Sequence, residues 1–387
     1  MLSQPGLRTF HANEFLRTDE SFEFADFTVA PLTCYRQTVE DYRRHRYSIP
    51  DSALLCFVVV QSQVQQSLET LEVPSEIVPV DLLAQFCWPR LKRVSLRGEN
   101  WDYHKLLVDI LAQMPALEEL VLTLAHRVGS DLVRLCPPDW AGSDLPWPQL
   151  KALVVTHPAR DDPLYARLPS SLCRLTLRCW PRHYLYPDST IRDFGWDSPV
   201  LSFFDMANIL RQCPSNHLDT LEIEFVGDQA DIELFRLISR AFPNLSSLTV
   251  FRYRPVGVVE TPENAIGEAL RPLSRLKYLY LHLDYPDAPD LLEAHLLPTN
   301  VVREQHARIR RIFEQSATRI THSLGSSLTI VSFLLRGPSL NDWYPFRVER
   351  TSDGRVVSVR SDPLALIRCG LTDSDDQAPM IQVTGAT

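Results

Sequence analysis

A six-residue pattern, L-x-x-L-x-L, recurs along the chain and constrains its fold more than any other feature. The hydrophobic residues at its fourth and sixth places alternate with other residues, as in a β-strand with one buried face. Clear copies begin at Leu68, Leu91, Leu117, Leu150, Leu172, Leu218, Leu245 and Leu276, and weaker copies begin at Leu7 and Leu328. A proline often precedes the first leucine, and proline marks the start of a strand because it cannot donate to a ladder. The chain therefore contains a repeated strand.

The spacing of the copies indicates the unit that repeats. Leu68 and Leu91 lie 23 residues apart, and Leu218 and Leu245 lie 27 residues apart. Both intervals fall within the roughly 20–29 residues of a leucine-rich repeat, although other intervals are longer. Apolar residues between the strands recur at helical spacing, which predicts amphipathic helices. These helices are expected at residues 106–114, 203–213 and 234–242, and in a segment that opens at Thr261 and Pro262.

Stacked strand–helix units predict an α/β fold, a leucine-rich-repeat solenoid (horseshoe) with a parallel concave sheet, convex helices and irregular repeats. We expect the solenoid to span residues 5–360, with an insertion near 157–200. A hairpin at 343–360 is expected to cap its last strand, and 371–387 is expected to be a disordered tail. Residues 299–324 predict a long helix, whose arginines we interpret as a solvated outer face.

Composition and charge exclude several classes of protein. The chain has 387 residues, of which 45% are hydrophobic, and its net charge of −9 lacks the basic field of a nucleic-acid binder. Its longest clean apolar run, residues 53–60, is too short to cross a bilayer. The eight cysteines are scattered without a C-x-x-C pair, which indicates reduced thiols. We therefore expect a cytoplasmic or nuclear protein that binds neither nucleic acid nor membrane.

The sequence contains no recognisable catalytic arrangement. It lacks phosphate-loop, dinucleotide-binding, serine-hydrolase and zinc-protease motifs, and no pair of cysteines or histidines has zinc spacing. His126, His157 and His183 are interpreted as solvated polar residues in loops that follow strands, rather than as bases or ligands. We therefore predict a protein that is not an enzyme and has no catalytic, metal or cofactor site. The alternative is an enzyme whose active site lies in the 157–200 insertion.

The residues that face the concave side of the predicted sheet are the best candidates for a binding site. They alternate with the leucines of each copy, because successive side chains of a strand point to opposite faces. The predicted protein-binding residues are Phe251, Tyr253, Tyr278, Tyr280 and His282, with Arg174 and Arg178 as a neighbouring charged contact. Aromatic residues with polar tips are common interface anchors. The alternative is that a long loop or the C-terminal segment folds over these aromatic side chains.

The P-x-L-x-x-L-x-L copies, the intervening helices and the closing W…D-G hairpin resemble the leucine-rich-repeat part of fungal F-box-like proteins, over most of residues 5–360. The resemblance implies a substrate receptor of a cullin-based ubiquitin ligase, whose concave face holds the protein to be ubiquitinated. In that family an F-box precedes the repeats and binds the ligase adaptor. Here the first residues, Pro5 to Phe10, already read as a repeat strand. We therefore expect either a substrate receptor of this type or a truncated relative that lacks the F-box, and adaptor binding only if an upstream F-box exists.

Overall fold

The computed structural model covers the whole chain and divides it into two compact units. The first unit comprises residues 1–199 with 212–214, and the second comprises 200–211 with 215–387. The described residues are 4, 6–13, 28–38, 51–79, 83–100, 107–132, 134–140, 142, 144–185, 194–214, 217–228, 230–255, 257–258, 261–286, 288, 298–324, 327–335, 342–352 and 356–362. Each unit is described below by itself.

The first unit is built on a parallel sheet. Its strands, in sheet order, are β1 (Thr9–Ala12), β2 (Cys34–Gln37), β3 (Thr70–Pro74), β4 (Arg93–Glu99), β5 (Glu119–Arg127), β6 (Ala152–Thr156) and β7 (Arg174–Arg178). All neighbours among them pair in parallel. A short strand, β8 (Trp196–Asp197), pairs antiparallel with the end of β5. The helical segments are α2 (Asp51–Val64), η2 (Ser75–Ile77), α4 (Leu107–Leu111), η3 (Pro163–Arg167) and η4 (His183–Leu185).

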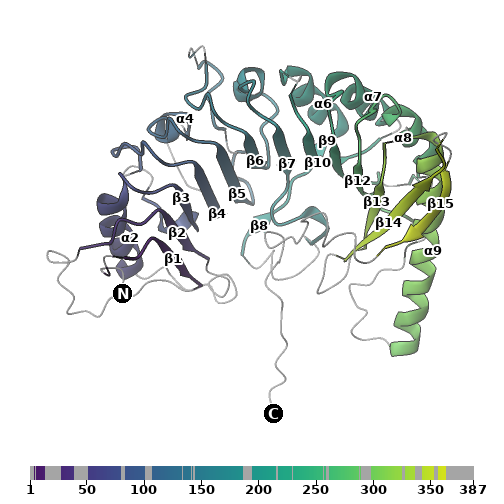
Figure 1. The fold of residues 1–387 in the computed structure, drawn as a ribbon, viewed down its shortest axis with the longest axis horizontal. Helices are drawn as coiled ribbons and strands as arrows, with labels where there is room; N and C mark the ends of the chain where they lie inside the picture. The colour runs from purple at the N-terminus through teal and green to yellow at the C-terminus, as the bar shows by residue number, and fades with distance from the viewer. Residues whose placement is uncertain are drawn as a thin grey trace. The chain divides into compact units, whose positions relative to one another are not determined.

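The second unit alternates strands with helices. Its parallel strands are β9 (Leu201–Ser202), β10 (Thr220–Val226), β11 (Ser247–Tyr253), β12 (Tyr278–His282) and β13 (Ile330–Leu335). Two antiparallel strands follow, β14 (Asp342–Arg350) and β15 (Val356–Ser361). Its helices are α6 (Phe203–Gln212), α7 (Ile232–Ala241), α8 (Glu263–Leu270) and α9 (Thr299–Ser323). In Figure 1, α6, α7 and α8 lie along one side of β10–β12.

The predicted strand copies are confirmed as strands. In all ten copies the strand begins two residues after the first leucine, as β4 does after Leu91 and β12 after Leu276. The sequence pattern missed an eleventh copy, whose strand β2 begins two residues after Leu32. There Tyr35 takes the place of the second leucine, and its ring is 1% exposed. A mixed α/β fold with a mostly parallel sheet in each unit follows from these pairings.

The register between strands keeps equivalent residues of the copies side by side. The second leucine positions form one buried row through the first unit, because Leu71, Val94 and Leu120 are register partners on adjacent strands. Burying a side chain of this size contributes about 1.5–3 kcal/mol. The carbonyl of Lys92 accepts from both Glu118 N (2.8 Å) and Glu119 N (2.9 Å). The same double contact recurs at the start of other strands, which fixes the register at one end of the ladder.

The predicted helices and hairpin are present, while some predictions fall outside the described residues. The predicted helical segments contain α4, α6, α7 and α8, and α9 fills the long helix expected at 299–324. The hairpin predicted at 343–360 is the pair β14–β15. Its expected turn at Asp353-Gly354 and the tail at 371–387 lie outside the described residues. A single solenoid over 5–360 stays a prediction. None of the described helices is both long and apolar enough to cross a bilayer.

Candidate functional site

The concave-face residues of the predicted repeats fall into rows across the strands. We call the residues two positions after each first leucine the leading row, and those six positions after it the trailing row. In the first unit the leading row includes Arg93 and Glu119, which are half-buried, and Arg174, which is exposed. The trailing row includes Thr123 and Arg178, which are both buried. The two halves of this face therefore differ in access to solvent.

Opposite charges pair across the accessible half of the first unit. Arg93 Nη1 lies 3.1 Å from Glu119 Oε2, and these residues are register partners on β4 and β5. Arg36 Nε lies 3.3 Å from Glu72 Oε2, also between register partners, on β2 and β3. All four side chains are partly exposed, so each pair contributes about 0–1 kcal/mol to folding. Their guanidinium and carboxylate groups remain within reach of a partner.

Two tryptophans cover the trailing half of the same face. Trp180 and Trp196 pack against Ala125 of β5, with their ring centroids 5.6 Å apart. The guanidinium of Arg97 lies over the Trp180 ring, 5.4 Å from its centroid. Trp196 Nε1 donates to Glu99 Oε1 at 3.2 Å. The chain after β7, within the 157–200 insertion, therefore folds back over the C-terminal ends of β4 and β5.

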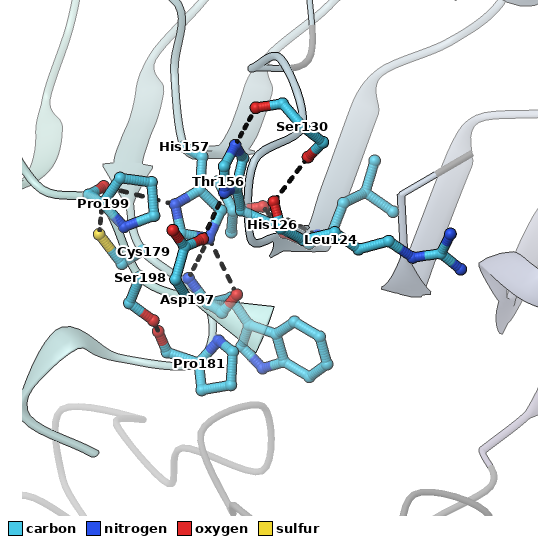
Figure 2. Close-up of polar contacts among 12 residues, drawn as sticks. Leu124, His126, Ser130, Thr156, His157, Cys179, Pro181, Asp197, Ser198 and Pro199 are labelled. Carbon is cyan, nitrogen blue, oxygen red and sulfur yellow. Dashed lines mark hydrogen bonds and ion pairs between the residues drawn. The ribbon is translucent and has the colours of Figure 1, made fainter. Parts of the chain in front are cut away.

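A buried histidine fastens this returning segment (Figure 2). His126, at the end of β5, is 7% exposed, and its Nδ1 contacts a carboxylate oxygen of Asp197 in β8. Its Nε2 lies 3.0 Å from the carbonyl oxygen of Ser130. The imidazole therefore bridges a side chain of β8 and the main chain of the turn that follows β5. This pair ties β8 to β5 beside the two backbone contacts of the antiparallel bridge.

A second histidine holds the same segment through main-chain groups. His157 follows β6 with a positive φ of 49°, and its Nε2 lies 3.0 Å from the carbonyl oxygen of Trp180. Its Nδ1 lies 3.5 Å from the carbonyl oxygen of Pro199, which also accepts from Cys179 Sγ at 3.3 Å. Figure 2 shows these contacts converging between β6 and the segment that ends at Pro199. Both imidazoles thus contact structural groups, an arrangement suited to fastening the insertion.

The described residues offer little material for metal chemistry. Among them, no group of three or more histidine, cysteine, aspartate or glutamate side chains is placed to hold a metal ion. Asp162 is 1% exposed, and its carboxylate accepts from the backbone N–H groups of Leu135 (2.7 Å) and Leu164 (2.9 Å). Burial raises the pKa of Asp162, against the lowering effect of these N–H groups. This carboxylate caps η3 and fixes a neighbouring loop.

The predicted aromatic patch of the second unit is gathered but covered. Phe251, Tyr253, Tyr280 and His282 are each 2–5% exposed, and Tyr278 is half-buried. Their neighbour in the structure is Trp343 of β14.

Trp343 covers two of these side chains. Its ring centroid lies 5.4 Å from Tyr280 and 5.9 Å from Phe251, both edge-on. The Tyr253 hydroxyl donates to Glu224 Oε1 at 2.7 Å, which directs its polar tip to β10 rather than to solvent. This arrangement matches the alternative expectation for the aromatic patch, in which the C-terminal segment folds over the side chains. A binding role for these residues stays a prediction.

The predicted arginines belong to the other unit, and their surroundings differ. Arg174 is exposed in the leading row of β7, whereas Arg178 is 7% exposed at its end. The sequence prediction missed Arg36 because the copy that begins at Leu32 was not recognised, and it did not include Glu72 although the copy at Leu68 was recognised. The spacing from Leu7 to Leu32, 25 residues, was a usable signal. It also missed the His126–Asp197 pair, for which no local pattern exists.

The class that the fold defines is a mixed α/β protein with a mostly parallel sheet in each unit. No known protein family matches the chain, and no curated protein is significantly similar to it in sequence.

Proposed function

We propose that the protein is a non-enzymatic scaffold of the leucine-rich-repeat type that binds another protein on its concave face. The repeated register supports this proposal more than any other observation. Strands that begin two residues after a leucine, in copy after copy, present the same three side-chain positions on one face. Repeats of this kind build an extended surface on which each copy can vary its exposed residues independently.

The accessible part of that face is the leading row and its neighbours. In the first unit it carries the Arg93–Glu119 and Arg36–Glu72 pairs, with Arg174 exposed nearby along the row. In the second unit the half-buried members are Thr220, Ser247 and Tyr278. We propose the leading surface of the first unit as the partner site, in place of the covered aromatic residues of the second unit. Partly exposed arginine and tyrosine are both enriched at binding hot spots.

The resemblance to fungal F-box-like proteins suggests the kind of partner. We propose a substrate receptor of a cullin-based ubiquitin ligase, or a truncated relative that lacks the F-box. In either case this chain binds the partner protein, folded or extended, and does not alter it chemically. The contacts of His126 and His157 with structural groups support a role for the insertion in folding rather than in catalysis.

Site-specific photo-crosslinking tests the proposed surface. A photoreactive amino acid replaces Arg93 or Arg174 in the full chain, and a control replaces Arg240, which is exposed on α7. We expect the leading-row positions to crosslink to a discrete protein and the α7 position to yield none. Equal crosslinking from all three positions would reject the surface. If the captured protein carries as much ubiquitin in cells without the chain as with it, the receptor role is wrong.

A further inference from the structure

The N-terminal part of α9 is the most exposed helical segment of the second unit. Residues 299–308 include no buried residue, whereas Ile309, Phe313 and Ile320 are each at most 2% exposed. In Figure 1 the helix runs beside β15 and continues past the strands. In this part His306 Nδ1 lies 2.9 Å from the Tyr344 hydroxyl, and the Ala307 carbonyl accepts from Arg311 Nε at 3.3 Å. This half of the helix is thus anchored on one side and open to solvent on the others.

Four arginines occupy the open side of this helix: Arg303, Arg308, Arg310 and Arg311. At about 100° per residue, Arg303 and Arg310 lie about 20° apart on one flank of the stripe formed by Ile309 and Phe313. Arg311 lies opposite the stripe, and Arg308 lies on its other flank. All four are exposed.

Carboxylates do not neutralise these arginines within the described part of the chain. Glu304 precedes Arg308 by four residues and Glu314 follows Arg310 by four, yet neither forms an ion pair there. By contrast, Arg319 further along the same helix lies 3.3 Å from Glu263. The whole helix carries five arginines and two glutamates, in a protein whose net charge is −9. This part of α9 therefore forms a local positive patch on a protein whose net charge is negative.

The spacing of the arginines suits carboxylates on an extended chain. Arg303 and Arg310 are seven residues apart, which is about 10 Å along a helix. Residues three apart on an extended peptide are separated by a similar distance, about 10 Å. Ala307 is exposed between the two arginines and leaves room for a peptide backbone. Each guanidinium can donate two parallel hydrogen bonds to one carboxylate.

We propose that Arg303, Arg308, Arg310 and Arg311 form a docking surface for an acidic peptide segment of a partner protein. This basic surface is separate from the concave face, and it does not depend on the proposed scaffold function. A nucleic acid fits it less well, because a polyanion with one charge per nucleotide is repelled by the net negative charge of the protein. A short peptide with a few carboxylates can engage Arg303 and Arg310 on one flank, while Arg308 and Arg311 add to the positive field, and it avoids most of that repulsion.

Fluorescence anisotropy on the full chain tests this surface. The probe is a fluorescein-labelled peptide of repeated Glu-Glu-Ser units, and the competitor is a single-stranded oligonucleotide of equal charge. The test variant is Arg303→Glu with Arg310→Glu. The control is Arg271→Glu with Arg275→Glu, which changes two exposed arginines after α8 and alters net charge equally. Circular dichroism confirms that both variants remain folded.

We expect the wild-type chain to bind the peptide, with affinity that falls as salt rises. The α9 variant should bind at least about tenfold more weakly, because two attractions become repulsions, and the control should differ by less than about threefold. Three results would overturn the proposal. They are absence of peptide binding by the wild type, equal weakening in both variants, and tighter binding of the oligonucleotide than of the peptide.

Discussion

The Trp343 ring packs edge-on against Tyr280, with ring centroids 5.4 Å apart. Tyr280 is on β12 and Trp343 is on β14, with β13 between them in the sheet. Tyr280 is 2% exposed, so it behaves as a core residue although it points away from the leucine row. The contact joins the antiparallel hairpin to the inner face of the parallel strands.

We therefore predict that Tyr280→Ala destabilises the fold by about 3–5 kcal/mol, because it opens a large cavity beneath Trp343. Leu279→Ala, on the opposite face of β12, should cost a similar 2–5 kcal/mol. Urea denaturation followed by circular dichroism measures both. Thr249→Ala, at the half-buried register partner of Tyr280, is the control and should change stability little. A near-neutral Tyr280→Ala would mean that the ring is free to serve a partner.

Gly227 is predicted to be intolerant of any side chain. A Cβ atom there would lie 2.9 Å from Arg252 Nε and would overlap the Asp231 carboxylate. Arg252 and Asp231 form a fully buried ion pair with an N···O distance of 2.6 Å. Gly227→Ala should separate this pair and cost roughly 3–5 kcal/mol of unfolding free energy, as removal of one partner does.

A double variant separates charge from packing at this site. Arg252→Met combined with Asp231→Leu removes both buried charges together, and replacements of this type are often close to neutral. Thermal unfolding of the double variant should therefore give a midpoint nearer to the wild type than that of Gly227→Ala. If the double variant is the less stable of the two, the ion pair is a larger source of stability than this reasoning allows.

The His126–Asp197 contact should hold the returning segment in place. Asp197→Ala removes the carboxylate from a buried imidazole, and Trp196 next to it is 4% exposed in the wild type. We expect the tryptophan emission to shift to longer wavelength and proteolytic cleavage near β8 to become faster. Asp205→Ala, at a half-buried carboxylate near the start of α6 that accepts from Ser202 Oγ at 2.9 Å, is the control. Unchanged proteolysis would show that backbone pairing with β5 alone secures the segment.

The buried thiols should be unreactive in the folded protein. Burial raises the pKa of Cys136 to about 12, with Asp162 adding to the effect, and burial raises the pKa of Cys213 to about 12. At pH 8 neither is a thiolate, so iodoacetamide should modify exposed Cys87 first. Peptide mapping by mass spectrometry measures the order. Modification of Cys213 at the rate of Cys87 in native buffer would contradict it.

The same raised pKa values give stability a pH dependence with a definite sign. Unfolded thiols ionise near pH 8.5, whereas these folded thiols stay protonated to about pH 12. The unfolded state therefore releases protons first, and their contribution to stability is lost as pH rises from about 8.5 toward 12. Replacing both by serine should flatten the fall in unfolding free energy over that range. An unchanged slope would assign the fall to other groups.

The strands could be predicted from sequence because each copy carries its own information. The alternation that begins at Leu91 or Leu245 needs no distant partner to be recognised, so the start of each strand followed from the leucine alone. The copy at Leu32 was missed because Tyr35 and Gln37 replace the second and third apolar residues. Tyr35 nevertheless occupies the leucine row, since its ring stacks on Phe10 at 5.2 Å.

Coverage of the inner face could not be predicted in the same way. Trp343 reaches Tyr280 across an intervening strand, and Asp197 reaches His126 across 71 residues of sequence. Such contacts depend on where a returning segment lies in space. Neither the period of the hydrophobic residues nor the spacing of the copies determines that position. The strand register brings Phe251 beside His282, as the spacing of the copies predicts, while the burial of these side chains could be learned only from the structure.

The reversal of direction at β14 limits how a chain of this kind can lengthen. A parallel repeat presents the same pattern of amides and carbonyls at its far edge as it receives at its near edge, so duplication of a repeat can be accommodated. After β13 the ladder instead runs antiparallel through β14 to β15. A duplicated strand–helix unit placed there must displace the hairpin and uncover Tyr280. Gene duplication in this fold should therefore succeed among β10–β12 and fail beyond β13.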